Sequence, residues 1–323
     1  MAMSGCRTPV IGIDIGSYAI KLAVLRRRQH RWLLMCGKSE PVGNNPGKTL
    51  GSMLGSLPCW LRLSRPKIVL AIHCAGVLFR KTKLPATLNL HQVDLALRLD
   101  LEKHLPQEDQ QGLFMDYCPV TLADGDSDAG HQLTRVWLTA VCTNALMQDC
   151  LQPLRAARRM PAQVAIDVMV LAAASSPRAG EHQMDHLLDA DNSLHLYIDA
   201  GFSSVRLCAM TGGVPGYVRS YPLSVGQLQA DCSGFLLTMR RALQQYHMSE
   251  MLTQPARVLL YGGRATTSGL TELIRQFFGF NPQSIDPFTD WPVDNACLNL
   301  KSLPPTILAP AIALAMQEPM TCQ

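Results

Sequence analysis

Two apolar stretches of the chain share one pattern of hydrophobic and polar positions. Residues 11–25 read IGIDIGSYAIKLAVL, residues 196–210 read LYIDAGFSSVRLCAM, and the two align without a gap. In each, an apolar strand runs into Asp-x-Gly, after which apolar residues alternate with the period of a β-strand. The pattern predicts two β-hairpins with a Gly at each turn, and the repeat predicts a duplicated fold.

The residues that this repeat superimposes suit the binding of a phosphorylated ligand. A Gly turn can adopt positive φ and present backbone N–H groups to phosphate oxygens, and a nearby Asp can hold Mg²⁺ or its waters. We therefore expect the two hairpins to clamp Mg-ATP, with Asp14 and Asp199 near the cation and Lys21 adding positive charge. The candidate cofactor-binding residues are Asp14, Gly16, Ser17, Lys21, Asp199, Gly201, Ser203, Gly262 and Gly263. The alternative for either Asp-x-Gly, taken alone, is a simple hairpin turn.

A third element, VLLYGGRATTSGL at 258–270, reads as an apolar strand, a diglycine and a polar turn before a helix. This order is typical of a backbone platform for a phosphate or a base, although diglycines are common in α/β loops. A Walker loop is excluded because the chain has no G-x-x-x-x-G-K-[ST]. A Rossmann site is excluded because a strand, not a helix, follows Gly16.

Two further segments are predicted to be helical. Over 91–105 the leucines alternate as in a strand, but Val93, Leu97 and Leu101 also recur at i+4, and the interspersed charges favour a helix. The apolar stretch PTILAPAIALAM at 305–316 is shorter than the roughly 20 residues that cross a bilayer, so it predicts a buried helix. The residues before the first strand are too few and too polar for a secretory signal, which predicts a cytoplasmic protein.

Composition limits the classes of function. The chain has 323 residues and a formal net charge of +4, which is too weak to predict nucleic-acid binding by itself. Its 11 Cys are scattered without a C-x-x-C pair, as is typical of reduced thiols in the cytosol.

In order along the chain, the Asp-x-Gly hairpin, its repeat and the late diglycine resemble the actin-like ATPase superfamily. Within it the chain resembles the type IV pilus assembly family PilM over nearly its whole length, and in particular enterobacterial members associated with the use of external DNA. The segments that carry this finer resemblance are PKIVLAIHCAGVLFRKTKLP (66–85), LRLDLEKHLPQEDQQGLFMDYCPV (97–120), VWLTAVCTNALMQDCLQPLRAARRMPAQVAIDVMVLAAA (136–174), FGFNPQSIDPF (278–288) and LAPAIALAM (308–316).

The resemblance implies an α/β, duplicated actin-like (RNase H-like) fold with two related halves. It also implies a small inserted subdomain in the first half and a reduced insertion in the second. The implied boundaries are 1–65 for the first half with its phosphate hairpin, 66–143 for the inserted subdomain, 144–190 for a return helix and connection, and 191–323 for the second half with its hairpin and diglycine loop.

Two departures from the family pattern weaken the expectation of a nucleotide site. The stretch between YPLSVGQLQ (221–229) and FLLTMRRALQQYHM (235–248) is shorter than the insertion of relatives, and Met169 stands where relatives keep an acidic residue. Mg-ATP is therefore either retained or lost, and any ATP turnover is expected to be slow. Asp167 is the candidate catalytic residue, with capping of a helix N-terminus as its alternative role.

Two functions fit this resemblance. The first is a cytoplasmic scaffold of a type IV pilus or DNA-uptake apparatus, regulated by ATP, peripheral to the inner membrane and without direct nucleic-acid contact. Its implied partner is the N-terminal cytoplasmic peptide of a PilN-like bitopic membrane protein, docked between the first subdomain and the insert with KIVLAIHC (67–74) as one wall. Self-association is a further expectation for the scaffold.

The second function is a small-molecule, sugar-type kinase of the same superfamily, because such kinases share both hairpins. Against it, the chain lacks the C-x-C-G-x-x-G-C cluster that many small kinases of this superfamily carry. Fold alone does not separate the two functions.

Overall fold

The computed structural model describes most of the chain. The described residues are 8–29, 31–104, 112–120, 134–175, 193–211, 214–222, 237, 255–279, 281–297, 300 and 303–317. The shortened insertion predicted from the sequence between residues 221 and 248 falls almost entirely outside them.

The elements follow one another in the order that the repeat predicts. The first half contains β1 (Val10–Ile15), β2 (Ala19–Arg28), β3 (Arg31–Pro41), α1 (Pro46–Gly55), α2 (Cys59–Leu63), β4 (Lys67–Ile72), α4 (Asn144–Ala156), β8 (Gln163–Ile166) and α5 (Asp167–Ala174). The insert contains η1 (Cys74–Gly76), β5 (Leu78–Pro85), α3 (Leu90–Glu102), β6 (Leu113–Val120) and β7 (Thr134–Thr143). The remainder contains β9 (Leu194–Ala200), β10 (Val205–Thr211), β11 (Val214–Tyr221), β12 (Arg257–Tyr261), α8 (Leu270–Phe278), β13 (Gln283–Ser284), α9 (Pro287–Asp290), β14 (Val293–Asn295) and α10 (Pro305–Met316).

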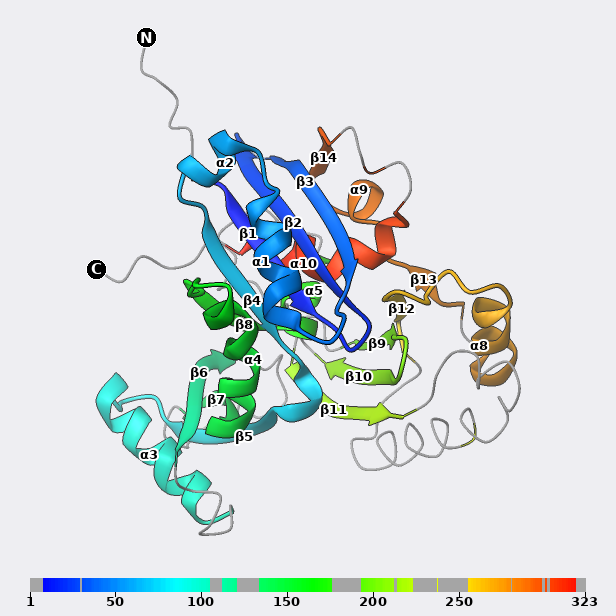
Figure 1. The fold of residues 1–323 in the computed structure, drawn as a ribbon. Helices are drawn as coiled ribbons and strands as arrows, with labels where there is room; N and C mark the ends of the chain where they lie inside the picture. The colour runs from blue at the N-terminus through cyan, green and yellow to red at the C-terminus, as the bar shows by residue number, and fades with distance from the viewer. Residues whose placement is uncertain are drawn as a thin grey trace.

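Two sheets repeat the same pairing. In the first, of order β14-β3-β2-β1-β4-β8, β1 pairs antiparallel with β2 and parallel with β4. In the second, of order β11-β10-β9-β12-β13, β9 pairs antiparallel with β10 and parallel with β12. The two sheets lie on either side of the molecule in Figure 1, with the hairpin turns directed toward each other. The duplicated α/β fold and both predicted hairpins are thus confirmed.

The position of β4 corrects one prediction. The sequence analysis assigned this strand to the inserted subdomain and to the wall of a docking groove. Instead, β4 lies between β1 and β8 in the first sheet, and Ile68 through Ile72 are all buried. A strand covered on both faces cannot form the wall of an open groove, so the inserted sheet begins only at β5.

The insert is a small sheet of order β5-β7-β6 with α3 packed on one face. Asn89 and Gln92 form a capping box at the start of α3. The buried residues of this helix are Val93, Leu97 and Leu101, so the i+4 pattern and not the strand-like alternation is the one that packs. The predicted helix in this region is confirmed.

The central helix α10 lies between the two sheets. Its residues join one core cluster with Val69 of the first sheet and Leu259 of the second. Gly12 permits this packing, because a Cβ at this position would lie 1.9 Å from the Ala311 carbonyl oxygen. The buried C-terminal helix predicted from the sequence is confirmed, and no helix of the described residues has the length and apolar character to cross a bilayer.

Candidate functional site

The two Asp-x-Gly hairpins meet at the carboxyl ends of β1 and β9. Both turns are closed in the same way, because Gly16 N–H donates to the Ala19 carbonyl and Gly201 N–H donates to the Ser204 carbonyl, each at 3.1 Å. A side chain at Gly201 would place its Cβ 2.6 Å from the Ser204 oxygen. Glycine is therefore required for the second turn by close backbone approach.

The diglycine loop after β12 completes the site from the second half. Gly262 has φ +100°, and a Cβ there would lie 2.2 Å from Asp199 Oδ1. The loop thus packs its backbone directly against the Asp-x-Gly carboxylate. Gly263, by contrast, has open space around it and lines the cavity.

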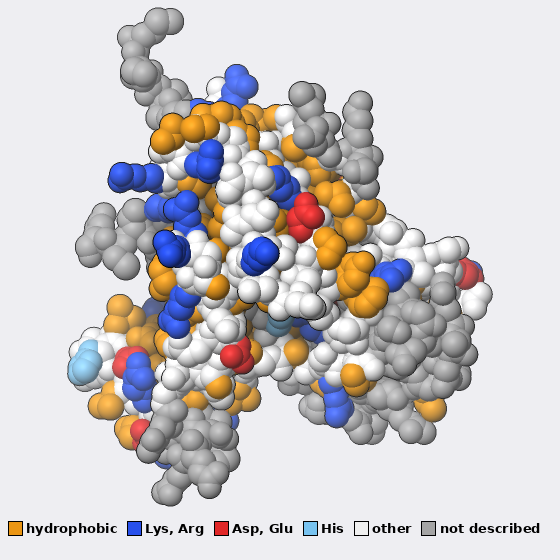
Figure 2. All heavy atoms as spheres, in the orientation of Figure 1, with side chains coloured by type: hydrophobic (Ala, Val, Ile, Leu, Met, Phe, Trp, Pro, Cys, Tyr) orange, Lys and Arg blue, Asp and Glu red, His pale blue; other side chains and the backbone are white. Residues whose placement is uncertain are grey.

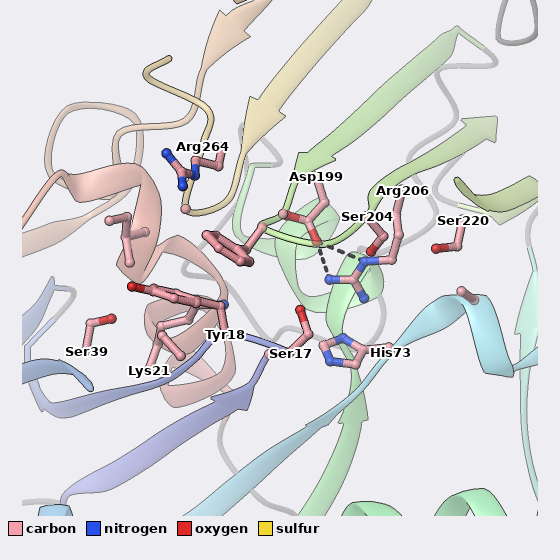
Figure 3. Close-up of a pocket in the computed structure, with 17 residues that line it drawn as sticks. Ser17, Tyr18, Lys21, Ser39, His73, Asp199, Ser204, Arg206, Ser220 and Arg264 are labelled. Atoms are coloured by element: carbon pink, nitrogen blue, oxygen red, sulfur yellow. Dashed lines mark hydrogen bonds and ion pairs between the residues drawn. The ribbon is translucent and has the colours of Figure 1, made fainter. Parts of the chain in front are cut away.

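A cavity of about 550 Å³ lies between the hairpins (Figure 3). The sequence-predicted residues that line it are Gly16, Ser17, Lys21, Asp199, Gly201 and Gly263. The predicted residues Asp14, Ser203, Gly262 and Asp167 contribute to the surroundings without lining it. The structure therefore brings the predicted set together, with Asp14 buried beneath Lys21.

The tips of the two hairpins touch each other. Ser17 Oγ and Ser203 Oγ share a hydrogen bond of 2.6 Å. The rings of Tyr18 and Phe202 stack with their centroids 4.1 Å apart, and the Arg264 guanidinium lies 5.1 Å from the Phe202 centroid. These contacts join the two hairpin tips, and Ser17, Tyr18 and Phe202 also line the cavity.

Each Asp-x-Gly carboxylate is paired with a cation from its own hairpin. Lys21 Nζ donates to Asp14 Oδ2 at 2.8 Å, and Arg206 Nε donates to Asp199 Oδ2 at 2.9 Å. Lys21 and Arg206 lie directly opposite these aspartates in the antiparallel registers. The pairing follows from the hairpin geometry, since cross-strand neighbours lie on the same face.

Arg206 also links the two halves. Its Nη1 donates to Asp167 Oδ2 at 2.8 Å, and Asp167 begins α5 at the end of the first sheet. His73 contacts the same carboxylate through Nδ1 at 2.9 Å and the Ile15 carbonyl through Nε2 at 3.0 Å. Because both acceptors lack a proton to donate, both ring nitrogens of His73 must donate, which requires the imidazolium form.

The pKa shifts of Asp167, His73 and Asp14 agree with their hydrogen bonds. Burial acts to raise the pKa of Asp167, but Arg206 and His73 outweigh it and hold that pKa well below its usual range. Burial likewise opposes the charged form of His73, but the hydrogen bond to Asp167 leaves its pKa raised. The pKa of Asp14 is lowered, because Lys21 outweighs the effect of burial on this carboxylate.

The carboxylates that a magnesium nucleotide would use are engaged by the protein's own cations. The three carboxylates, of Asp14, Asp167 and Asp199, are engaged by Lys21, His73 and Arg206, and Arg264 adds a fourth basic group at the cavity. Asp14 Oδ1 is a buried carboxylate oxygen without a partner among the described residues, and Mg²⁺ carried by a nucleotide needs only one or two protein carboxylates besides waters and phosphates. Within the described residues, no three His, Cys, Asp or Glu side chains converge as metal ligands.

Asp167 is held in place on every side. Its carboxylate accepts hydrogen bonds from Cys74 N–H at 3.0 Å and Val168 N–H at 2.7 Å, besides those from His73 and Arg206. Asp167 is the first residue of α5, and Ile166 occupies the N-cap position. The N-cap role predicted as the alternative for Asp167 is therefore wrong. A buried carboxylate with a lowered pKa is a weak base, and its catalytic role stays a prediction.

Met169 has a packing role that explains its departure from the family pattern. Its side chain packs against the cluster of Val120, Leu138 and Val214, which joins the insert to the second half. A carboxylate at this position would have to be buried among apolar side chains.

Sequence reasoning missed several residues of the site. Tyr18, Phe202, His73 and Arg264 carry no motif, and they become site residues only when the two hairpins and η1 are brought together. Arg206 had a signal, because the repeat aligns it with Lys21 and the hairpin register sets it opposite Asp199.

Comparison with solved structures identifies a similar fold. The chain is similar to the structure described as the PilM–PilN type IV pilus biogenesis complex, with a TM-score of 0.72 and 19% identity over 95% of this chain and 97% of the other. The chain therefore has an actin-like fold, shared with the matched chain of that complex. No family model matches, and no curated protein matches.

Two further structures are similar at lower scores. One is a protein with an actin-like ATPase fold and unknown function from Bacteroides thetaiotaomicron, with a TM-score of 0.49 and 10% identity over 98% of this chain and 99% of the other. The other is the ethanolamine utilization protein EutJ from Carboxydothermus hydrogenoformans, with a TM-score of 0.46 and 11% identity over 98% of this chain and 93% of the other.

Proposed function

We propose that this chain is a PilM-like scaffold that docks the N-terminal cytoplasmic tail of a PilN-like bitopic membrane protein. The observation that carries the proposal is the similarity of the whole fold to PilM in the PilM–PilN complex. In the finer form of the proposal, the chain is HofM-type, its partner is HofN-type, and both serve a DNA-utilisation apparatus at the cytoplasmic face of the inner membrane.

The insert offers the surface for such a tail. In β6, alternate residues share one face, which carries Phe114, Asp116, Cys118 and Val120. Cys118 and Val120 pack against Val214 of the second half, whereas Phe114 on the same face is 44% exposed. Among the described strands β6 lies at the edge of its sheet, so an extended tail can pair with its backbone and place an apolar side chain on Phe114.

This surface replaces the groove wall that the sequence assigned to β4. Ordering a disordered tail has an entropic cost, so the expected affinity is on the order of micromolar. Docking on β6 makes no use of the cleft between the hairpins. We therefore propose that docking needs no nucleotide, in place of the ATP regulation expected from the family.

The kinase alternative has no support in the geometry of the cleft. A sugar kinase needs a base that faces a substrate hydroxyl, and Asp167 is 2% exposed with its oxygens engaged by four donors. A slow ATPase would need the same kind of group to orient water.

The test is binding of the partner's first dozen residues, labelled with a fluorophore, to the purified chain by anisotropy. Phe114→Ser is expected to weaken binding by at least about tenfold, as for a central apolar anchor. The matched control is Leu95→Ser, which removes an exposed leucine from α3 on the other face of the insert. Absence of binding to the wild-type chain would refute the docking function, and equal loss in both variants would refute the site on β6.

A further inference from the structure

Two turns lie side by side at the end of the first sheet that faces away from the cleft. The turn after α2 leads into β4, and the turn after α4 leads into β8. These strands are adjacent and parallel, with Val69 opposite Gln163, and Ala162 N–H donates to the Ile68 carbonyl at 2.8 Å. The cleft residues His73 and Asp167 follow the carboxyl ends of the same two strands.

The surface formed by α2 and these two turns combines large apolar side chains with arginines. We call it the α2–α4 face. Its exposed apolar residues are Trp60 at 47%, Leu63 at 75% and Met160 at 62% exposure. Its exposed arginines are Arg62, Arg65, Arg158 and Arg159. Figure 2 shows hydrophobic side chains gathered over α2 with Lys and Arg side chains beside and below them.

The charge of this face has one sign. Residues 41–93 and 150–166, which include both turns and their helix ends, contain no Asp or Glu. Ion pairs recorded among the described residues involve arginines elsewhere, such as Arg31 and Arg98, and none of the four arginines of the α2–α4 face. The face therefore presents its positive charge to whatever approaches it.

Two of these arginines occupy a backbone conformation that favours glycine. Arg65 has φ +49° and Arg158 has φ +55°, each at the position just after a helix C-cap. Glycine is the usual residue at this position, because a Cβ in the left-handed region costs conformational energy. The chain has an arginine at both positions despite that cost. We infer that these two side chains have a function that offsets the strain of the backbone.

We propose that the α2–α4 face binds the surface of an anionic phospholipid bilayer. Tryptophan and aliphatic side chains partition into the interfacial region of a bilayer, and arginines beside them attract anionic headgroups. A nucleic acid would account for the arginines but not for Leu63 and Met160, since phosphate contacts need no exposed aliphatic side chains. This binding uses residues distinct from the β6 surface and does not depend on the tail-docking function.

Trp60 provides a direct readout of bilayer binding. The chain has four Trp, and Trp32, Trp137 and Trp291 are buried at 3–4% exposure, so Trp60 is the exposed one. On mixing with vesicles containing about one third phosphatidylglycerol, its emission is expected to shift to the blue and the chain to co-sediment. Pure phosphatidylcholine vesicles are expected to give neither effect, and added salt is expected to weaken binding.

The decisive variant is Arg65→Gly with Arg158→Gly. It removes two cations from the face and relieves two strained backbone positions, so its melting temperature is expected to be equal to or above that of the wild type. Its binding to anionic vesicles is expected to be about 30-fold weaker, which corresponds to about 1 kcal/mol for each arginine. The matched control, Arg98→Ala with Arg275→Ala, removes two exposed arginines elsewhere and is expected to bind vesicles as the wild type does.

Three results would each overturn the proposal. They are binding of neutral and anionic vesicles with equal affinity, unchanged binding by the double glycine variant, and binding of a duplex DNA oligonucleotide without binding of anionic vesicles. Because the double glycine variant is expected to remain fully folded, its loss of binding cannot be attributed to unfolding.

Discussion

Replacing Arg206 by Met tests whether the cleft is held together by its own cations. The substitution keeps an unbranched stem and removes the guanidinium. It leaves Asp199 without its cation and breaks the direct link to Asp167 between the two halves. The side chains concerned are nearly enclosed, with Arg206 16%, Asp167 3% and Asp199 8% exposed.

The magnitude follows from this enclosure. Removing one partner of a buried pair leaves an unpaired charge and costs about 3–5 kcal/mol. For a chain of 323 residues the melting temperature is then expected to fall by roughly 4–7 °C. If the paired cation stands in for a divalent metal, millimolar Mg²⁺ should stabilise the variant and leave the wild type unchanged.

Thermal and urea denaturation, followed by circular dichroism with and without Mg²⁺, measure these effects. The control is Arg98→Met, which breaks the exposed pair with Asp94 and is expected to cost about 0–1 kcal/mol. A variant of Arg206 as stable as this control would refute the reasoning, because it would mean that the carboxylates do not need the guanidinium. Stabilisation of the wild-type protein by Mg²⁺ would show that the metal competes with the protein's own cations for these carboxylates.

Three further predictions concern the core, the pH dependence and the nucleotide. Gly12→Ala would place a Cβ 1.9 Å from the Ala311 oxygen, and it is expected to lower the free energy of unfolding, measured by urea denaturation, by about 3 kcal/mol or more. The control is Gly55→Ala, whose Cβ meets nothing within 4 Å and which should leave the stability unchanged or slightly increased. Since the folded pKa of His73 is raised above its ordinary value of 6.5, the contribution of His73 to stability is fully present below pH 6.5 and is lost as the pH rises through the folded pKa. His73→Gln should therefore reduce the free energy of unfolding more at about pH 6 than at about pH 9, and an equal loss at both would contradict the imidazolium. In isothermal titration calorimetry, Mg-ATP is expected to give no saturable heat with the wild-type chain, and binding in the micromolar range would show that the hairpin tips part to admit it.

The sequence by itself determined the local elements and the internal symmetry. Strand alternation around Asp-x-Gly, with a Gly at each turn, is enough to specify a hairpin, because turn geometry and the period of two are properties of neighbouring residues. The same is true of α3, where the i+4 recurrence of Val93, Leu97 and Leu101 agrees with its packed face. The gapless repeat then implied two sheets with equivalent pairing, and the cross-strand partners of Asp14 and Asp199 could be read from the hairpin register.

Only the tertiary structure decided which elements and side chains that are distant in the sequence lie next to each other. The apolar strand β4 could pair in either sheet, and it joins the first because parallel pairing with β1 and β8 buries both of its faces. The choice of partner for Asp167 depended on Arg206 arriving from the other half, which no local pattern specifies. In the same way, Arg65 and Arg158 are distant in sequence and become one cationic face only because their strands are adjacent and parallel, since strand order is fixed by the packing of the whole sheet.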